Sequence, residues 1–186
     1  MNLPNCIAFD GDRCIASGDA RGVALIVKEA LDRNPQAPVL TFELETGRPV
    51  DFDLRGTPDE VVQRIQGAAP EAKKPGRPKL GVVAREVTLL PRHWDWLSSQ
   101  PGGASVALRK LVEEARKTNA EKDRHREAQE AAYRFISAMA GNRPGFEEAT
   151  RALFAGNRER FELETSGWPP DVREHASKLA ASVFEH

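Results

Sequence analysis

A stretch rich in proline, glycine and lysine divides this chain, and it constrains the fold more than any other feature. Residues 67–80 hold three prolines, two glycines and four cations, which only Glu71 opposes. The stretch has no aromatic residue and little to bury, so an extended, flexible arm is expected rather than a helix or a strand. Four regions follow: an α+β unit over 1–66, a basic flexible linker over 67–82, a strand-helix-helix segment over 83–119 and a helical C-terminal region over 120–186.

Charge is segregated along the chain, although 27 basic and 28 acidic residues leave a formal net charge of only -1. Residues 67–126 carry 13 basic and 7 acidic residues, whereas residues 1–66 carry 7 and 11 and residues 127–186 carry 7 and 10. A basic centre creates a local field that selects polyanionic partners even when the total charge is close to zero. A solvated, charge-rich helix next to a basic linker is the alternative that stays open.

The sequence lacks the signals of several protein classes. No run approaches the roughly 20 apolar residues that a membrane span needs, and the first five residues do not form a secretory signal. Cys6 and Cys14 are too few for a disulfide scaffold, which favours a reducing, cytoplasmic location and, with DNA as partner, the nucleoid. Asp10 and Asp12 could be paired carboxylates for phosphoryl transfer, but they fit a hairpin turn better. The four histidines are scattered and no P-loop is present, so we expect no enzyme, cofactor or metal site.

The N-terminal unit begins with the pattern of a hairpin followed by a helix. Residues 6–9 and 13–17 are short strand-like runs around Asp10-Gly11, a strong turn signal. Asp19 precedes a helical stretch with one apolar face. Thr57 precedes a second helix, which has proline at its first position and acids in its first turn.

A second hairpin is predicted between these helices. Residues 39–44 and 50–54 flank Gly47-Arg48-Pro49, and the second run alternates apolar residues with aspartates, as in a strand with one wet face. The predicted fold class is therefore α+β, with an N-terminal ββαββα unit in which a helix lies across one face of a four-stranded sheet.

A short strand over 84–90 and two helical segments are predicted after the linker. Pro101-Gly102-Gly103 separates the two helices, and apolar residues recur at helical spacing over 104–115. The second helix either breaks near Thr118-Asn119 or continues to Gly141, the next helix-breaking residue. Three breaks divide the helical last third: Pro144, Gly156 and Pro169-Pro170.

Residues 84–117 resemble the ribbon-helix-helix family of DNA-binding repressors. The resemblance rests on Val87-Thr88-Leu89-Leu90-Pro91 as ribbon and helix start, Leu97 in the first helix, Gly103-Ala104-Ser105 at the start of the second, and Arg109, Leu111, Val112 and Ala115 along it. In that family two chains pair their strands into an antiparallel ribbon that lies in the major groove. A strand with two short helices cannot close a core alone, which also favours an obligate homodimer.

The resemblance implies two sets of functional residues. The dimerisation set is Val87, Leu89, Trp94, Leu97, Leu108, Leu111 and Val112. In the DNA-binding set, Arg85 and Thr88 approach the major groove, Ser105 holds a phosphate, and Arg109 and Lys110 add positive charge. An ordinary β-α-α fragment packed inside a larger domain is the alternative.

Residues 73–79, with the sequence Lys-Lys-Pro-Gly-Arg-Pro-Lys, resemble an AT-hook, although Pro75 stands where the first core arginine of that motif would be. The resemblance implies that the arm contacts the minor groove of A·T-rich double-stranded DNA through Lys73, Lys74, Gly76, Arg77 and Lys79. The same Gly-Arg-Pro tripeptide occurs at 47–49 in an acidic region, so the surrounding cations carry the signal. The alternative is a solvated basic linker.

The whole chain also resembles one of the bacterial families catalogued as domains of unknown function, which implies no activity. The leading hypothesis is a homodimeric DNA-binding protein of low sequence specificity, either a transcriptional regulator or a nucleoid-type binder. Its N- and C-terminal regions would bind a protein or small-molecule effector. The alternative is a protein-interaction module that dimerises through residues 84–90 without nucleic acid, which Glu86 and Leu90 on the outward side of the strand favour.

Overall fold

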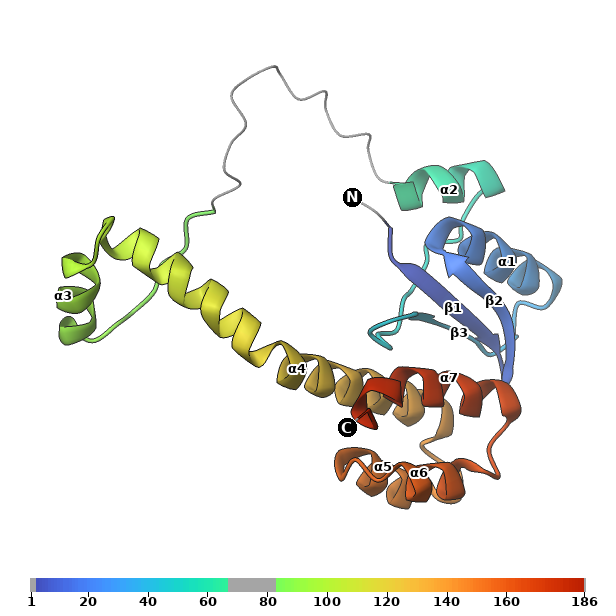
Figure 1. Ribbon diagram of the computed structural model, residues 1–186. Helices are drawn as coiled ribbons and strands as arrows, with labels where there is room; N and C mark the ends of the chain where they lie inside the picture. Colours follow the sequence, from blue (N-terminus) through green and yellow to red (C-terminus); the bar gives the residue numbers. More distant parts are fainter. Residues whose placement is uncertain (1–2, 67–82, 186) are drawn as a thin grey trace. The chain divides into compact units, whose positions relative to one another are not determined.

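The computed structural model describes residues 3–66 and 83–185, which divide into two units (Figure 1). Residues 3–66 and 124–185 form one, here called the sheet unit, and residues 83–123 form the other, the helical unit. The elements follow in the order β1 (Asn5–Asp10), β2 (Arg13–Asp19), α1 (Ala20–Arg33), β3 (Val39–Glu43), α2 (Pro58–Gln66), α3 (Pro91–Ser99), α4 (Gly103–Ala140), α5 (Phe146–Phe154), α6 (Arg158–Thr165), α7 (Pro170–Ala180) and a short 3-10 helix, η1 (Ala181–Val183). The fold is α+β, as predicted.

The sheet is antiparallel, and β1 is its central strand in the order β2-β1-β3. The predicted first hairpin is confirmed, with Asp10 opposite Arg13 and Gly11 in the left-handed conformation (φ 57°) that its tight turn requires. Cys6 and Ala8 face one side of the sheet, and Ile7 and Phe9 face the other, yet all four are buried. A continuous apolar run is the pattern of a strand that is covered on both faces.

The predicted four-stranded ββαββα unit is wrong, because the described residues contain three strands. Residues 50–54 form no strand; Phe42 and Pro49 form an isolated bridge, and the Val50 amide donates to Thr41 O at 2.8 Å. Pro49 has no N–H group with which to continue a ladder. The apolar side chains of Val50, Phe52 and Leu54 instead pack against the hydrophobic cluster beneath α1.

On one face of the sheet lies α1, which Asp19 caps as predicted. The Asp19 carboxylate accepts hydrogen bonds from the amides of Arg21 at 3.1 Å and Gly22 at 3.4 Å. The buried residues of α1 are Ala20, Val23, Ala24 and Val27, and the cluster on this face joins α1 to Cys6 and Ala8 of β1 and Ala16 of β2.

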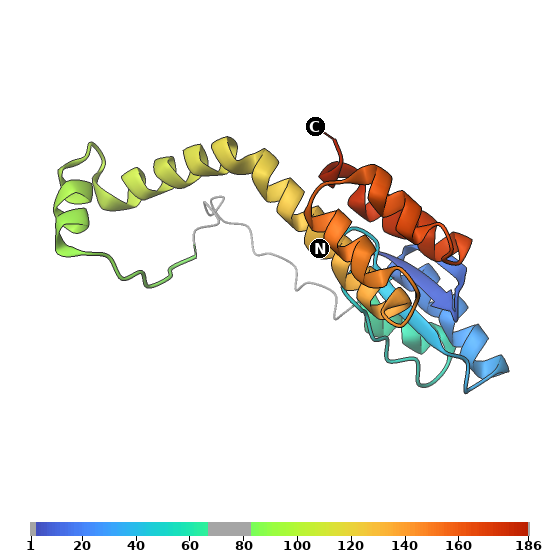
Figure 2. The same cartoon turned by 90° about the horizontal axis from the view of Figure 1, so that it is seen from below.

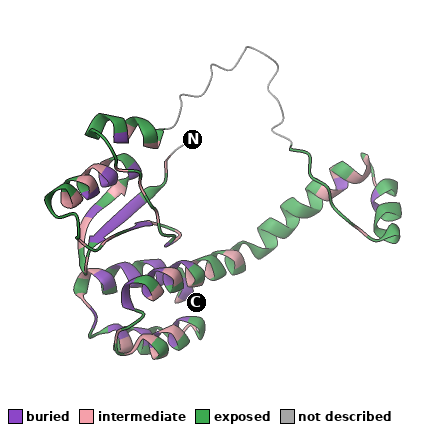
Figure 3. Cartoon of the chain, turned by 180° about the vertical axis from the view of Figure 1, so that it is seen from behind, coloured by how far each residue is buried: buried purple, intermediate pink, exposed green. Residues whose placement is uncertain are grey.

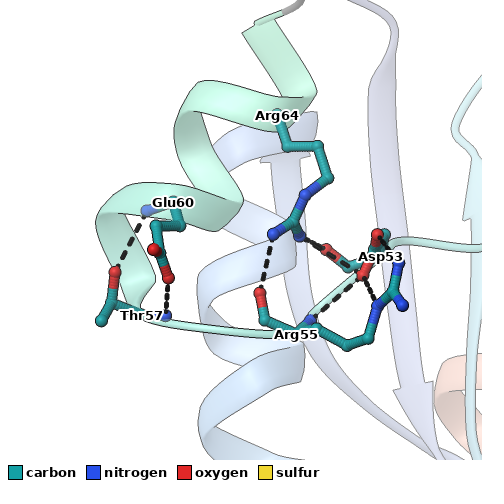
Figure 4. Close-up of polar contacts among 5 residues, drawn as sticks. All are labelled: Asp53, Arg55, Thr57, Glu60 and Arg64. Atoms are coloured by element: carbon teal, nitrogen blue, oxygen red, sulfur yellow. Dashed lines mark hydrogen bonds and ion pairs between the residues drawn. The ribbon is translucent and has the colours of Figure 1, made fainter.

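The start of α2 is fixed by reciprocal hydrogen bonds (Figure 4). The Thr57 amide donates to Glu60 Oε2 at 2.7 Å, and the Glu60 amide donates to Thr57 Oγ1 at 3.3 Å, which is a capping box. Arg64 donates to the carbonyl oxygens of Asp53 and Arg55, so the preceding loop is tied to the helix. The Arg55 guanidinium hydrogen-bonds the Asp53 carboxylate and lowers the pKa of that group.

The other face of the sheet is covered by the end of α4 and by α7, as Figures 1 and 2 show. Ile7, Phe9 and Phe42 belong to one buried cluster with Phe135 and Ile136 of α4, which continues into α5, α6 and α7. The ring centroids of Phe42 and Phe135 lie 5.2 Å apart, edge to face. The N-terminal sheet and the C-terminal helices therefore share one core.

Helix α4 is continuous over 38 residues, which settles the question that the sequence left open at Thr118-Asn119. Both side chains donate to the backbone carbonyl four residues earlier, Thr118 Oγ1 at 3.0 Å and Asn119 Nδ2 at 2.8 Å, and so stay compatible with the helix. The predicted breaks at Pro144, Gly156 and Pro169-Pro170 are confirmed by the bounds of α5, α6 and α7. No described helix combines the length and apolarity needed to cross a membrane.

Candidate functional sites

The predicted DNA-contacting segment lies at the beginning of the helical unit. Residues 83–90 belong to no helix or strand, so the strand predicted over 84–90 is not present within the described chain. A strand requires a neighbouring strand for its hydrogen bonds, and the described part of a single chain supplies none here. Arg85 and Thr88 are exposed, as are Glu86 and Leu90.

The helical unit exposes most of its apolar side chains. Of the twelve large hydrophobic residues that are exposed in the described chain, seven lie between residues 83 and 112: Val83, Val87, Leu90, Trp94, Trp96, Leu111 and Val112. Within the same unit Leu97 and Ala107 are the buried apolar residues. Figure 3 accordingly shows α3 and the first part of α4 mostly in the colour of exposed residues. The helical unit lacks a core of its own.

The predicted dimerisation residues divide by their burial. Leu97 is covered by its own chain, with 3% of its surface exposed. Leu89 and Leu108 are half-buried. The remaining four are exposed: Val87, Trp94, Leu111 and Val112. Along the apolar stripe predicted over 104–115, Ala107 is therefore buried, whereas Leu111 and Val112 are exposed to solvent.

The other predicted DNA-binding residues lie at the start of α4 or outside the described residues. Ser105, Arg109 and Lys110 are exposed in the first two turns of α4, after a turn in which Gly102 (φ 86°) and Gly103 (φ 75°) are left-handed. The predicted AT-hook-like contacts lie outside the described residues: Lys73, Lys74, Gly76, Arg77 and Lys79.

The sheet unit contains a cleft of about 740 Å³ that the sequence did not reveal. Its lining comes from four parts of the chain, each distant from the next in sequence. These are Ile7, Cys14 and Ser17 on the sheet, Leu44 and Glu45 after β3, Arg124, Glu127 and Ala128 on α4, and Asp171, Glu174, His175, Lys178, Leu179 and Ser182 on α7 and η1.

His175 is the most deeply buried polar side chain of this lining. It lies on the buried face of α7 with 4% of its surface exposed, and its ring centroid is 4.6 Å from that of Phe135, edge to face. Its Nε2 atom is buried and has no hydrogen-bond partner among the described residues. Burial lowers the pKa of His175 to about 4, and the positive charge of Lys178 adds to the effect. The imidazole is therefore neutral at pH 7.

Cys14 and Asp171 connect β2 to α7 at the cleft. The Cys14 amide donates to Asp171 Oδ2 at 2.8 Å, although the two residues are 157 positions apart. Burial, followed by the nearby Asp171 carboxylate, raises the pKa of the Cys14 thiol, so this group is protonated at neutral pH rather than an activated nucleophile. Cys6 is a buried free thiol in the cluster beneath α1, as the sequence predicted for a small hydrophobic residue.

The cleft has more carboxylates than cations. Glu45, Glu127, Asp171 and Glu174 line it together with Arg124 and Lys178. Glu174 forms an ion pair with Lys178 at 2.6 Å. Glu45 and Glu127 are exposed and form no ion pair with another described residue. The lining therefore has a formal negative charge that its own cations do not balance.

The two aspartates considered as paired carboxylates lie at the first hairpin. Asp12, at the tip of the first hairpin, forms an ion pair with Arg143, and Asp10 ends β1 opposite Arg13. No group of three or more His, Cys, Asp or Glu side chains in the described part of the chain is placed to hold a metal ion.

A family model described as "Uncharacterized protein conserved in bacteria (DUF2239)" matches residues 5–180, nearly the whole chain. No curated protein and no solved structure matches. The match covers both units and the linker between residues 66 and 83, and it does not show a ribbon-helix-helix family.

Proposed function

The chain belongs to an uncharacterised protein family conserved in bacteria, and on that premise we propose that it is a homodimeric, DNA-binding protein. The proposal places the duplex against the arm of residues 73–79 and the helical unit. It assigns binding of low sequence specificity, as for a nucleoid-type protein or a weakly selective regulator. Arg85, Arg109 and Lys110 are the described residues to which it gives DNA contacts.

The homodimer of this proposal rests on one observation, the seven large apolar side chains exposed between residues 83 and 112. Monomeric proteins rarely leave so many apolar residues uncovered on so short a segment. Pairing of residues 84–90 with the same residues of a second copy gives this segment hydrogen-bond partners and covers apolar surface on both chains. In a two-fold symmetric dimer, the exposed cations of both chains also contribute to one DNA-binding surface.

The charges of the described residues are compatible with contact to phosphate. Arg85, Arg109 and Lys110 are exposed and form no ion pair with another described residue. Such cations neutralise phosphates without reading sequence. Glu86 lies in the same segment and opposes a polyanion. With three exposed cations and one opposing carboxylate, the affinity for DNA should depend on salt and should discriminate weakly between sequences.

A fluorescence-anisotropy titration of the full chain against A·T-rich and mixed duplexes tests the proposal. Because each neutralised phosphate releases counterion, affinity should fall steeply between about 50 and 200 mM salt. Arg77→Ala with Lys79→Ala should weaken binding to A·T-rich duplex about tenfold at low salt, since two phosphate or groove contacts are lost. Arg48→Ala is the matched control, because Arg48 belongs to the second Gly-Arg-Pro tripeptide, in the acidic part of the sheet unit.

The protein-interaction module is the second candidate, and exposed Glu86 and Leu90 favour it. Both side chains suit a protein surface better than a nucleic acid groove. Under this alternative the chain still forms dimers but binds neither duplex up to tens of micromolar at either salt concentration. The titration therefore separates the two functions, and light scattering on the same sample reports the oligomeric state.

A further inference from the structure

Trp96 is an exposed aromatic residue that lies outside the predicted dimerisation set. It belongs to α3 and has 51% of its surface exposed, whereas Leu97, the next residue, is 3% exposed. With 3.6 residues in each helical turn, Trp94 lies about 60° from Leu97 around the helix axis, and Trp96 lies about 160° from Trp94. A partner surface that covers Trp94 therefore contacts the opposite side of α3 from Trp96.

Two residues that can contact nucleic acid flank Trp96 on the surface of α3. Arg92 and His93 lie four and three residues before it, and these two spacings place side chains next to each other on a helix. Both are exposed, and neither forms an ion pair with another described residue. Asp95, the carboxylate of this helix, lies about 100° from Trp96 around the axis. An aromatic side chain between an arginine and an imidazole is thus open to solvent.

This combination of groups suits an unpaired nucleobase. Bases of a single strand stack on aromatic side chains whatever their identity, and nearby cations hold the phosphates of the strand. In a duplex the bases are stacked on each other, so a base must leave the stack before a side chain can cover its face. Charge favours the same ligand, because Arg85 is also exposed without an ion pair to another described residue, and the basic stretch of residues 73–79 precedes α3 in the sequence.

We propose that Trp96 stacks on an unpaired base of single-stranded DNA, while Arg92 contacts a phosphate and His93 donates a hydrogen bond to the same strand. The inference rests on the proposed DNA-binding function and names its preferred substrate, DNA whose strands are separated. The affinity for a single strand then contains a contribution from stacking that the affinity for a closed duplex lacks.

A fluorescence-anisotropy titration of the full chain with two labelled strands of about 15 nucleotides separates stacking from charge. One strand is oligothymidine, and the other has the same phosphates but no bases. The chain should bind oligothymidine about tenfold more tightly than the abasic strand, because each stacked base strengthens binding. Oligothymidine should also quench tryptophan emission, and the abasic strand should not.

Variants of Trp96 test the ring itself. Trp96→Leu keeps an apolar side chain but has no ring, so the two strands should bind about equally. Trp96→Phe retains a ring and should keep most of the preference for oligothymidine, which shows that substitution at this position does not disrupt the fold. Phe154→Leu is the matched control, because Phe154 is 52% exposed in the sheet unit and should leave the preference unchanged.

The outcomes separate this inference from the function on which it rests. Equal binding of the two strands by the parent protein, an unchanged preference in Trp96→Leu, or a lost preference in Phe154→Leu overturns the stacking role of Trp96. Binding of duplex without binding of either single strand refutes this inference alone. If the chain binds neither the duplexes nor the single strands, the proposed DNA-binding function is refuted with it.

Discussion

At the scale of the residue, His175 shows how position changes chemistry. The sequence presents it as one of four scattered histidines, yet on α7 it occupies the apolar face with Val172, Ala176 and Leu179. Its neighbours there are aromatic, and the ring centroid of Phe9 lies 6.2 Å away. Burial then makes protonation unfavourable, and His175 couples the stability of the sheet unit to pH.

Stability should fall as the pH decreases from about 6.5 toward 4. The unfolded chain takes up a proton near the ordinary histidine pKa of 6.5, while folded His175 stays neutral down to about 4. The unfolded state therefore binds more protons in this window, and each pH unit lowers the free energy of unfolding by up to about 1.4 kcal/mol. Urea unfolding at about pH 7, 6 and 5 measures the slope.

His175→Gln is the control for this prediction, because glutamine does not titrate. The variant should lose the slope between pH 6.5 and 5 even if it is less stable at every pH. The same slope in both proteins would assign the pH dependence to other groups.

At the scale of the element, the loop after β3 packs closely on α4. Gly47 is left-handed (φ 62°), and a Cβ atom at this position would lie 2.3 Å from the carbonyl oxygen of Ala131. The loop backbone thus approaches the helix backbone at a distance that no side chain allows. Arg134 of the same helix donates to Thr46 O at 3.1 Å. These two contacts hold the loop directly after β3 against α4.

Gly47→Ala should destabilise the sheet unit by about 3 kcal/mol, since it combines left-handed strain with a clash against a helix backbone. Gly11→Ala is the matched comparison, because Gly11 has nearly the same φ of 57° but nothing within 4 Å of its would-be Cβ. That substitution should cost only about 1 kcal/mol. Thermal and urea unfolding of the two variants give the difference, and equal losses would show that the close approach to Ala131 is unimportant.

At the scale of the whole molecule, the two units differ in how they bury apolar surface. The sheet unit has clusters on both faces of its sheet. The helical unit leaves Trp94, Trp96, Leu111 and Val112 exposed. The proposed dimer therefore needs contacts between the helical units only, because the sheet unit already buries its apolar residues within one chain.

Leu111→Glu with Val112→Glu should convert the proposed dimer to a monomer, because four buried charges would replace apolar contacts at a two-fold interface. Both residues are exposed in the single chain, at 43% and 54%, so the chain itself should still fold. Ile26→Glu, at a residue 42% exposed on α1, is the control and should leave the mass unchanged. Size exclusion with light scattering measures the mass; a monomeric parent protein or a dimeric double variant would contradict the assembly.

The sequence by itself determined the parts of this protein that depend on neighbours along the chain. The hairpin at Asp10-Gly11, the cap at Asp19, the start of α2 and the breaks between α5, α6 and α7 all follow from turn and capping chemistry within a few residues. The family resemblance to uncharacterised bacterial proteins also agrees with the match over residues 5–180.

Only the tertiary structure decided which distant parts share a core. Cys14 hydrogen-bonds to Asp171, and the ring of Phe9 packs against that of Phe135. These residues are so far apart in the sequence that no periodic pattern could predict their contacts. The cleft arises from those same contacts, and for that reason its lining residues gave no motif. The missing fourth strand has a similar cause, since Val50, Phe52 and Leu54 fit a strand pattern equally well when they pack beneath α1. Local pattern specifies which side chains are apolar, and packing specifies what covers them.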